Sequence, residues 1–229
     1  MRLAVLGPPG SDRETIADAI AARLGVPCLS LAGMFQAEIR AKTPAGLQAT
    51  QHMNAGELVP DQVLLSMIRN RLTQPDVAAG FVLDGFPNHA VTAVALDAVL
   101  FDLGTPIDRA IDLVLPDAEV LRRMAGRRTC RGCCRTWHTE FAAPTRPNVC
   151  DRCGGELFQR HDDNPDRITA GLQSYRPAAA ATLSHYRALG RVSWILGCGS
   201  AIHVCREWTL RADRGRVRAD RGVVAGDDA

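Results

Sequence analysis

The chain has 229 residues, of which 46% are hydrophobic and 23% are charged, and its formal net charge is only +2. This length suits one α/β domain with a modest insertion, and the composition is that of a globular protein with a core of normal size. The weak net charge argues against a strong overall attraction to nucleic acid or to a membrane surface. No apolar run reaches membrane-spanning length, and residues 1–7 are too short for a secretion signal, so we expect a cytoplasmic protein.

Short apolar runs alternate with helical periods along most of the chain. Strands are predicted at Arg2–Leu6, Val26–Leu31, Gly80–Leu83, Ala110–Leu115 and Val192–Leu196. Helices are predicted at residues 15–24, 34–41, 61–72, 91–100, 118–126, 168–189 and 202–210, while a polar stretch covers residues 43–51. This alternation implies parallel strands joined by right-handed crossovers, and therefore an α/β fold with a doubly wound, five-stranded sheet.

Two places depart from that pattern. Pro177 should kink or split the helix at residues 168–189, because proline lacks the backbone N–H that a helix interior uses. Residues from Arg211 onward mix Arg, Asp and Gly with little apolar content, which predicts a disordered tail.

Residues 127–163 are rich in Cys, Arg, Gly and Pro and form an inserted module. Two Cys-x-x-Cys pairs, separated by sixteen residues, can supply four thiolates to one tetrahedral zinc ion: Cys130, Cys133, Cys150 and Cys153. A site closed by four thiolates leaves no position for water, so this zinc is predicted to be structural. Cys134 could compete as a ligand, and His138 is a weaker candidate that suits hydrogen bonding better.

The same module has a second interpretation as a nucleic-acid-binding zinc ribbon. Its arginines favour that reading: Arg127, Arg128, Arg131, Arg135, Arg146 and Arg152. The surrounding α/β pattern and the lack of an aromatic stacking series argue against it.

Five blocks, in order, resemble the adenylate kinase family over residues 1 to about 212. They are Gly7-Pro8-Pro9-Gly10, the segment 54–61, the segment 80–87 with Asp84-Gly85-Phe86-Pro87, Arg127-Arg128-Thr129-Cys130, and Cys150 to Asn164. The resemblance, to the bacterial long form, implies a core of residues 1–128 and 163–212, a monophosphate-binding insert at 30–59, a zinc lid at 129–162 and a tail at 213–229. It also implies a monomer that transfers a phosphoryl group from Mg-ATP to AMP.

On the donor side, the resemblance implies that nucleotide is bound by the phosphate loop and two later arginines: Gly7, Pro8, Pro9, Gly10, Ser11, Asp12, Arg13, Glu14, Thr15, Arg123 and Arg127. It further implies catalytic roles for Arg13, Arg127, Arg160 and Asp84, the last through magnesium. The loop departs from the usual G-x-x-x-x-G-K-[ST], because Asp12 stands for a glycine, Arg13 for the lysine and Glu14 for the following glycine. An ordinary strand–turn–helix with acidic residues at the helix start explains the loop about equally well.

On the acceptor side, the corresponding candidates are Gln36, Glu57, Val59, Gly85 and Asn88. Gln36 and Asn88 stand where the family has arginines, Leu31 and Gly33 replace a Thr and an Asp, Thr92 replaces a Gln, and Gly171 aligns with another arginine. Each hydrogen bond to a charged group contributes about 1.5–3 kcal/mol, so losing two or three removes roughly 3–9 kcal/mol. That is comparable to the whole binding energy of a sub-millimolar ligand, about 5–7 kcal/mol. Arg40, Lys42, Arg69 or His89 would have to substitute.

Three functions remain open from the sequence. The first is an ATP-dependent nucleoside monophosphate kinase, weak or with an unusual acceptor. The second is a nucleotide-binding pseudokinase with structural zinc, and the third is the nucleic-acid-binding ribbon.

Overall fold

A five-stranded parallel sheet, in the order β2-β3-β1-β4-β8, forms the centre of the molecule. The structure is a computed structural model and describes residues 1–55 and 59–196. The strands of the sheet are β1 (Arg2–Leu6), β2 (Cys28–Ser30), β3 (Phe81–Asp84), β4 (Arg109–Val114) and β8 (Val192–Leu196). The order confirms the predicted doubly wound sheet and places the carboxyl end of β1 between those of β3 and β4.

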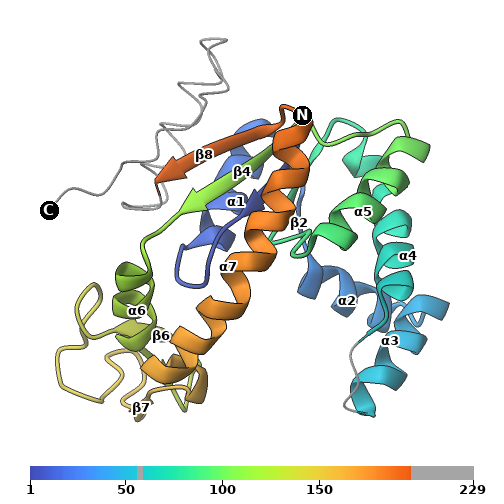
Figure 1. Cartoon of the computed structure of the whole chain (residues 1–229). Helices are drawn as coiled ribbons and strands as arrows, with labels where there is room; N and C mark the ends of the chain where they lie inside the picture. The colour runs from blue at the N-terminus through green and yellow to red at the C-terminus, as the bar shows by residue number, and fades with distance from the viewer. Residues whose placement is uncertain (56–58, 197–229) are drawn as a thin grey trace, which may run out of the picture.

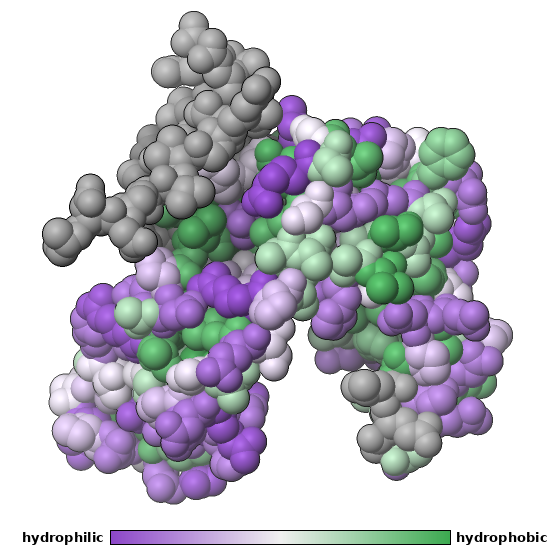
Figure 2. Space-filling model, in the orientation of Figure 1, coloured by the Kyte–Doolittle hydropathy of each residue, from purple (hydrophilic) through white to green (hydrophobic). Residues whose placement is uncertain are grey.

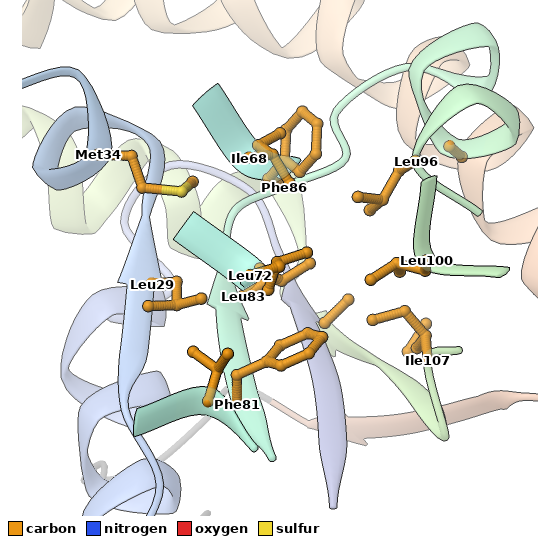
Figure 3. Packing of buried hydrophobic residues seen from close by; sticks show 14 of the residues in the cluster. Leu29, Met34, Ile68, Leu72, Phe81, Leu83, Phe86, Leu96, Leu100 and Ile107 are labelled. Carbon is orange, nitrogen blue, oxygen red and sulfur yellow. The ribbon is translucent and has the colours of Figure 1, made fainter. Parts of the chain in front are cut away.

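Helices cover both faces of this sheet (Figure 1). On one face, α1 (Arg13–Leu24) buries Ile16 and Ile20 against the strands. The other face carries α4 (Asp61–Leu72), α5 (Ala90–Asp102) and α7 (Pro165–Ala188). Figure 3 shows side chains of this second cluster, Leu72 and Leu83 among them, between the strands and the helices. Each such fully buried side chain contributes about 1.5–3 kcal/mol of transfer free energy.

Two smaller parts extend from the core. One consists of α2 (Leu31–Arg40) and α3 (Pro44–Asn54), packed against α4. The other consists of α6 (Asp117–Ala125) and an antiparallel sheet in the order β6-β5-β7, made of β5 (Arg127–Cys130), β6 (Thr136–His138) and β7 (Leu157–Phe158). Figure 2 shows an open gap between these two parts at the lower edge of the molecule. Short 3₁₀ turns lie at Pro75–Val77 and His161–Asp163.

Three local expectations need correction. The second helix starts at Leu31 rather than Met34, because the Ser30 side chain accepts a hydrogen bond from the backbone N–H of Gly33 and caps it. The polar stretch at 43–51 folds into α3, whose cap is Thr43 and whose buried face is made of small residues. Pro177 does not split its helix, since α7 runs unbroken from Pro165 to Ala188.

The helix expected at 202–210 and the tail expected after Arg211 lie outside the described residues, as does Glu57. No helix in the described part of the chain is long and apolar enough to cross a membrane.

Candidate functional site

The loop between β1 and α1 is shaped by close packing around Gly7. A Cβ at Gly7 would lie 2.8 Å from Ser11 Oγ and 2.9 Å from Leu113 Cβ, so only glycine fits there without a shift. The Ser11 side chain is buried, and its hydroxyl finds no hydrogen-bond partner among the described residues. The loop therefore presents a tight backbone turn at the N-terminus of α1, the kind of place where anions bind.

Asp12 occupies a position that favours glycine. Its φ is +53°, in the left-handed region, and its side chain makes no cap to α1. Aspartate tolerates this conformation better than most residues do. The Asp12 carboxylate is exposed and lies 3.9 Å from an Nη of Arg123. The replacement of glycine predicted from the sequence thus keeps the backbone turn but adds a charge beside it.

Arg13, the first residue of α1, reaches across to the end of β3. Its Nε donates a 2.6 Å hydrogen bond to Oδ1 of Asp84, and Nη1 lies 3.4 Å from the carbonyl oxygen of Gly7. The guanidinium also covers Gly85, where a Cβ would lie 2.5 Å from Arg13 Cζ. The Asp84 side chain is only 6% exposed, so this is a nearly buried carboxylate whose charge is balanced by Arg13.

A magnesium ion at Asp84 would compete with Arg13 for this carboxylate. A divalent cation at Asp84 needs carboxylate oxygens that are free to coordinate it or its water. In the described residues, Oδ1 of Asp84 is held by the guanidinium of Arg13. Asp84 and Arg13 were both predicted as catalytic groups, but their direct contact was not.

The three later arginines predicted to contact phosphate also have acidic partners. Arg123 donates to Glu119 at 2.7 Å and to the Gly10 carbonyl oxygen at 3.2 Å. Arg127 makes a forked pair with Asp163, which is fully buried, and Arg160 lies 3.6 Å from the exposed Asp162. All four predicted phosphate-binding arginines are therefore paired with carboxylates.

Two partly buried groups that the sequence did not single out complete the electrostatics near Arg13. Burial raises the pKa of Tyr175 to about 12, Asp112 raises it as well, and Arg13 acts in the opposite direction. Burial also raises the pKa of Asp112, on β4, against the opposing effect of Arg187 and Arg176. Periodicity gives no sign of either role, because both positions lie within ordinary strand and helix patterns.

The acceptor side presents few charges. Gln36 and Asn88 are exposed, and Val59 packs against the small cluster between α3 and α4. Arg40 donates to the backbone carbonyl of Gln36 on its own helix. Arg69 pairs with the exposed Asp102 at the end of α5.

The four predicted metal ligands come together. The sulfur atoms of Cys130, Cys133, Cys150 and Cys153 all lie within 4.8 Å of one another. A set of four thiols at this spacing fits one tetrahedral metal ion. A Cβ at Gly155 would lie 3.0 Å from the sulfur of Cys130, so glycine allows the second loop to approach the cluster.

The two Cys-x-x-Cys pairs form matching turns. The backbone N–H of Cys134 donates to the Cys130 carbonyl, and that of Gly154 donates to the Cys150 carbonyl. Cys134 and Gly154 both have positive φ, at +57° and +72°. Cys134 is thus the turn residue of the first pair, and its exposed side chain is not part of the four-sulfur group.

Backbone hydrogen bonds within these turns lower the pKa of Cys130 and Cys150, whereas hydrogen bonds to the neighbouring cysteines raise that of Cys153. Burial opposes ionisation of Cys150, yet backbone N–H groups of Cys153 and Arg152 lower the pKa of its thiol to about 6. His138 has a structural role instead, as expected. Its Nδ1 accepts from the backbone N–H groups of Glu140 and Phe141, and Nε2 lies 3.1 Å from the Arg123 carbonyl oxygen.

The arginines around this cluster face the protein's own side chains. The guanidinium of Arg131 lies over Phe158 and also pairs with Glu156, while that of Arg135 lies over Trp137. These two aromatic faces are therefore covered by guanidinium groups and are not open platforms for bases. The geometry gives no support to the nucleic-acid-binding interpretation.

Comparisons with known proteins agree with the fold and with the order of the motifs. The family model for adenylate kinase matches residues 5–191. The adenylate kinase of Salinispora tropica is 48% identical over 87% of this chain and 92% of its own length. That of Acidothermus cellulolyticus is 42% identical over 91% of this chain and all of its own length, and that of Streptomyces griseus is 39% identical over 97% and 100%. The chain belongs to the adenylate kinase family.

Proposed function

We propose that this chain transfers a phosphoryl group from a nucleoside triphosphate to a nucleoside monophosphate, with weak binding of the acceptor. The observation that carries the proposal is the tight Gly7–Ser11 turn at the start of α1, with Arg13 beside it, in a chain that belongs to the adenylate kinase family. Phosphoryl transfer depends mainly on positioning and on neutralising charge, which backbone N–H groups and arginines supply.

In this proposal the donor phosphates lie at the N-terminus of α1. Arg123 is held beside Gly10 and is in place to contact them. Arg127 and Arg160 supply further positive charge from the edge of the small sheet. Each of these arginines must exchange its carboxylate partner for phosphate oxygens, and this exchange lowers the net free energy gained on nucleotide binding.

The small sheet acts as a lid whose base is closed by Arg127 and Asp163. The proposed lid is residues 129–162, and the proposed core is residues 1–128 and 163–212. Arg127 and Asp163 therefore lie in the core, just before and just after the lid, where they pair with each other. Gln159 adds to the closure by donating to the carbonyl oxygens of Ala125 and Asp163. The insert at residues 30–59 takes the monophosphate, and closure of both parts across the gap in Figure 2 excludes water from the transfer.

The cysteine cluster holds a structural zinc ion in this proposal. Zinc supplies no chemistry to the reaction, because four thiolates close its coordination shell and bind two distant loops together. Four free thiols close together suit a reducing compartment, which supports a cytoplasmic location.

A kinase assay with the purified zinc-loaded chain tests this function. ADP formation is measured with Mg-ATP and each of AMP, GMP, CMP and UMP. We expect turnover with a high KM for the monophosphate. The double variant Gln36→Arg/Asn88→Arg restores two cations on the acceptor side, and we expect it to raise kcat/KM for AMP about 100-fold or more.

A second candidate is a nucleotide-binding protein without turnover. The pairing of all four donor-side arginines and the loss of the acceptor arginines favour it. The assay separates the two. ATP binding without ADP formation, with any of the four monophosphates and in both chains, would support the second candidate and overturn the first.

A further inference from the structure

Arg13 joins three parts of the site in a way that a lysine could not. Its Nε donates to Asp84, its Nη1 lies near the Gly7 carbonyl, and the plane of the guanidinium covers the backbone of Gly85. The φ of Gly85 is +69°, and any side chain there would collide with the guanidinium. A compact ammonium group has no planar fork with which to make these contacts together.

The charges of the loop are divided between two arginines. Asp84 has a side chain that is 6% exposed and pairs with Arg13, whose side chain is 33% exposed. Asp12, which is mainly exposed, lies toward Arg123 instead. Asp84 is thus the buried carboxylate at this end of β3, and a positive charge from the protein already balances it.

We propose that the guanidinium of Arg13 is the resident cation at Asp84 and takes the place of a divalent metal there. This inference rests on the proposed function and concerns the same site. The guanidinium has five N–H donors. With Nε on Asp84 and Nη1 near the Gly7 carbonyl, the other N–H groups of this partly exposed side chain can contact phosphate oxygens, so one side chain links carboxylate and phosphate as a metal ion would. The triphosphate then binds equally well with and without magnesium.

Equilibrium binding of ATP, followed by calorimetry in excess EDTA and in excess Mg²⁺, tests the inference. For the unaltered chain we expect dissociation constants that differ by less than about threefold. For Arg13→Lys, which frees Asp84 to face a hydrated metal ion, we expect Mg²⁺ to tighten binding by about tenfold or more, the factor that one charge-assisted contact typically gives.

Two further variants make the result specific. Adding Asp84→Asn to Arg13→Lys should abolish the newly gained magnesium effect. Arg71→Lys is the matched control, because Arg71 also pairs with an aspartate, Asp76, but lies at the end of α4 away from the loop. It should behave as the unaltered chain does. Circular dichroism confirms that each variant is folded before binding is measured.

The outcomes separate this inference from the proposed function. An equal magnesium effect in the unaltered chain and in Arg13→Lys, or its absence from both, would overturn the inference and leave the function standing. No ATP binding to either chain in either buffer would overturn the proposed function and the inference with it.

Discussion

The cysteine cluster and the acceptor side differ in how far they keep the residues that the family resemblance implies. In the cluster, all four ligands are present and two matching turns bring their sulfur atoms together. On the acceptor side the helices α2 and α3 are formed, but Gln36 and Asn88 stand where the family resemblance implies arginines. Groups that hold the fold and groups that bind ligand can therefore change independently.

The donor loop lies between these extremes. It keeps the glycine-dependent turn and a cation at residue 13, but that cation is bound to Asp84. The arginines predicted to bind phosphate are present, but their charges are neutralised by the protein's own carboxylates. Substitutions in the framework should therefore cost more than substitutions in the altered binding groups.

Removing one cysteine ligand should give the largest effect. Cys150→Ser replaces a buried thiol of the cluster, and we expect the bound zinc to fall from about one ion per chain to near none. Structural zinc in small peptides contributes roughly 10–16 kcal/mol of folding free energy, so the small sheet should lose its order. Metal content by a colorimetric zinc indicator and proteolysis within residues 129–162 measure the change.

Cys134→Ser is the matched control for that change. Cys134 is exposed and belongs to the turn rather than to the four-sulfur group. Zinc content and protease resistance should stay as in the unaltered chain. Loss of zinc from Cys134→Ser would contradict the assignment of the four ligands.

The second effect concerns the base of the lid. Arg127→Ala leaves the fully buried carboxylate of Asp163 without its guanidinium partner. Breaking a buried pair in this way costs about 3–5 kcal/mol. Arg160→Ala removes an arginine whose partner, Asp162, is exposed, and should cost no more than about 1 kcal/mol. Urea denaturation measures the free energy of unfolding of both variants. An equal loss in the two would contradict the proposal that the Arg127–Asp163 pair closes the base of the lid.

A third comparison uses two glycines with the same backbone conformation. Gly85 and Gly104 have φ values of +69° and +67°, but only Gly85 has the Arg13 guanidinium in the space of a Cβ. Gly104→Ala should cost about 1–2 kcal/mol from the left-handed conformation alone. Gly85→Ala should cost a further ~1.5–3 kcal/mol, because it also displaces Arg13 from Asp84. Thermal denaturation of both variants measures the difference.

The sequence predicts the elements with strong hydrophobic periods best. The bounds of α4 and β1 agree with the prediction to the residue, because α4 has regular apolar spacing and β1 contains a continuous apolar run that is buried. It does not predict α3, because the buried face of that helix consists of Ala45, Gly46 and Ala49 rather than large apolar residues. A Cβ at Gly46 would lie 2.3 Å from the Glu38 carbonyl oxygen, so small residues there serve the close approach of α2.

In the site, groups that lie close together in the sequence could be predicted, whereas contacts between residues far apart in the sequence could not. The metal ligands could be predicted because each pair lies within four residues, and spacing alone describes the chemistry. The contact between Arg13 and Asp84 joins residues 71 positions apart. It depends on the pairing of β1 with β3 and on a rotamer of Arg13, and neither can be deduced from the spacing of residues.

The smallest predicted effect concerns Asp112, whose burial raises the pKa of its carboxyl above the ordinary value of 3.8. A raised folded-state pKa means that ionisation opposes folding, so this penalty is absent below the unfolded pKa and grows as the pH rises through the folded one. Asp112→Asn removes the charge and should raise Tm at pH 7 by a few degrees at most, since 1 kcal/mol shifts Tm by about 2–4 °C in a chain of this size. The advantage should vanish near pH 3, where the wild-type carboxyl is protonated in both states. A difference in Tm that is the same at pH 3 and pH 7 would show that packing rather than charge is responsible. Lower stability of the variant at pH 7 would show that Arg176 and Arg187 compensate the carboxylate fully, and that the fold depends on this charge.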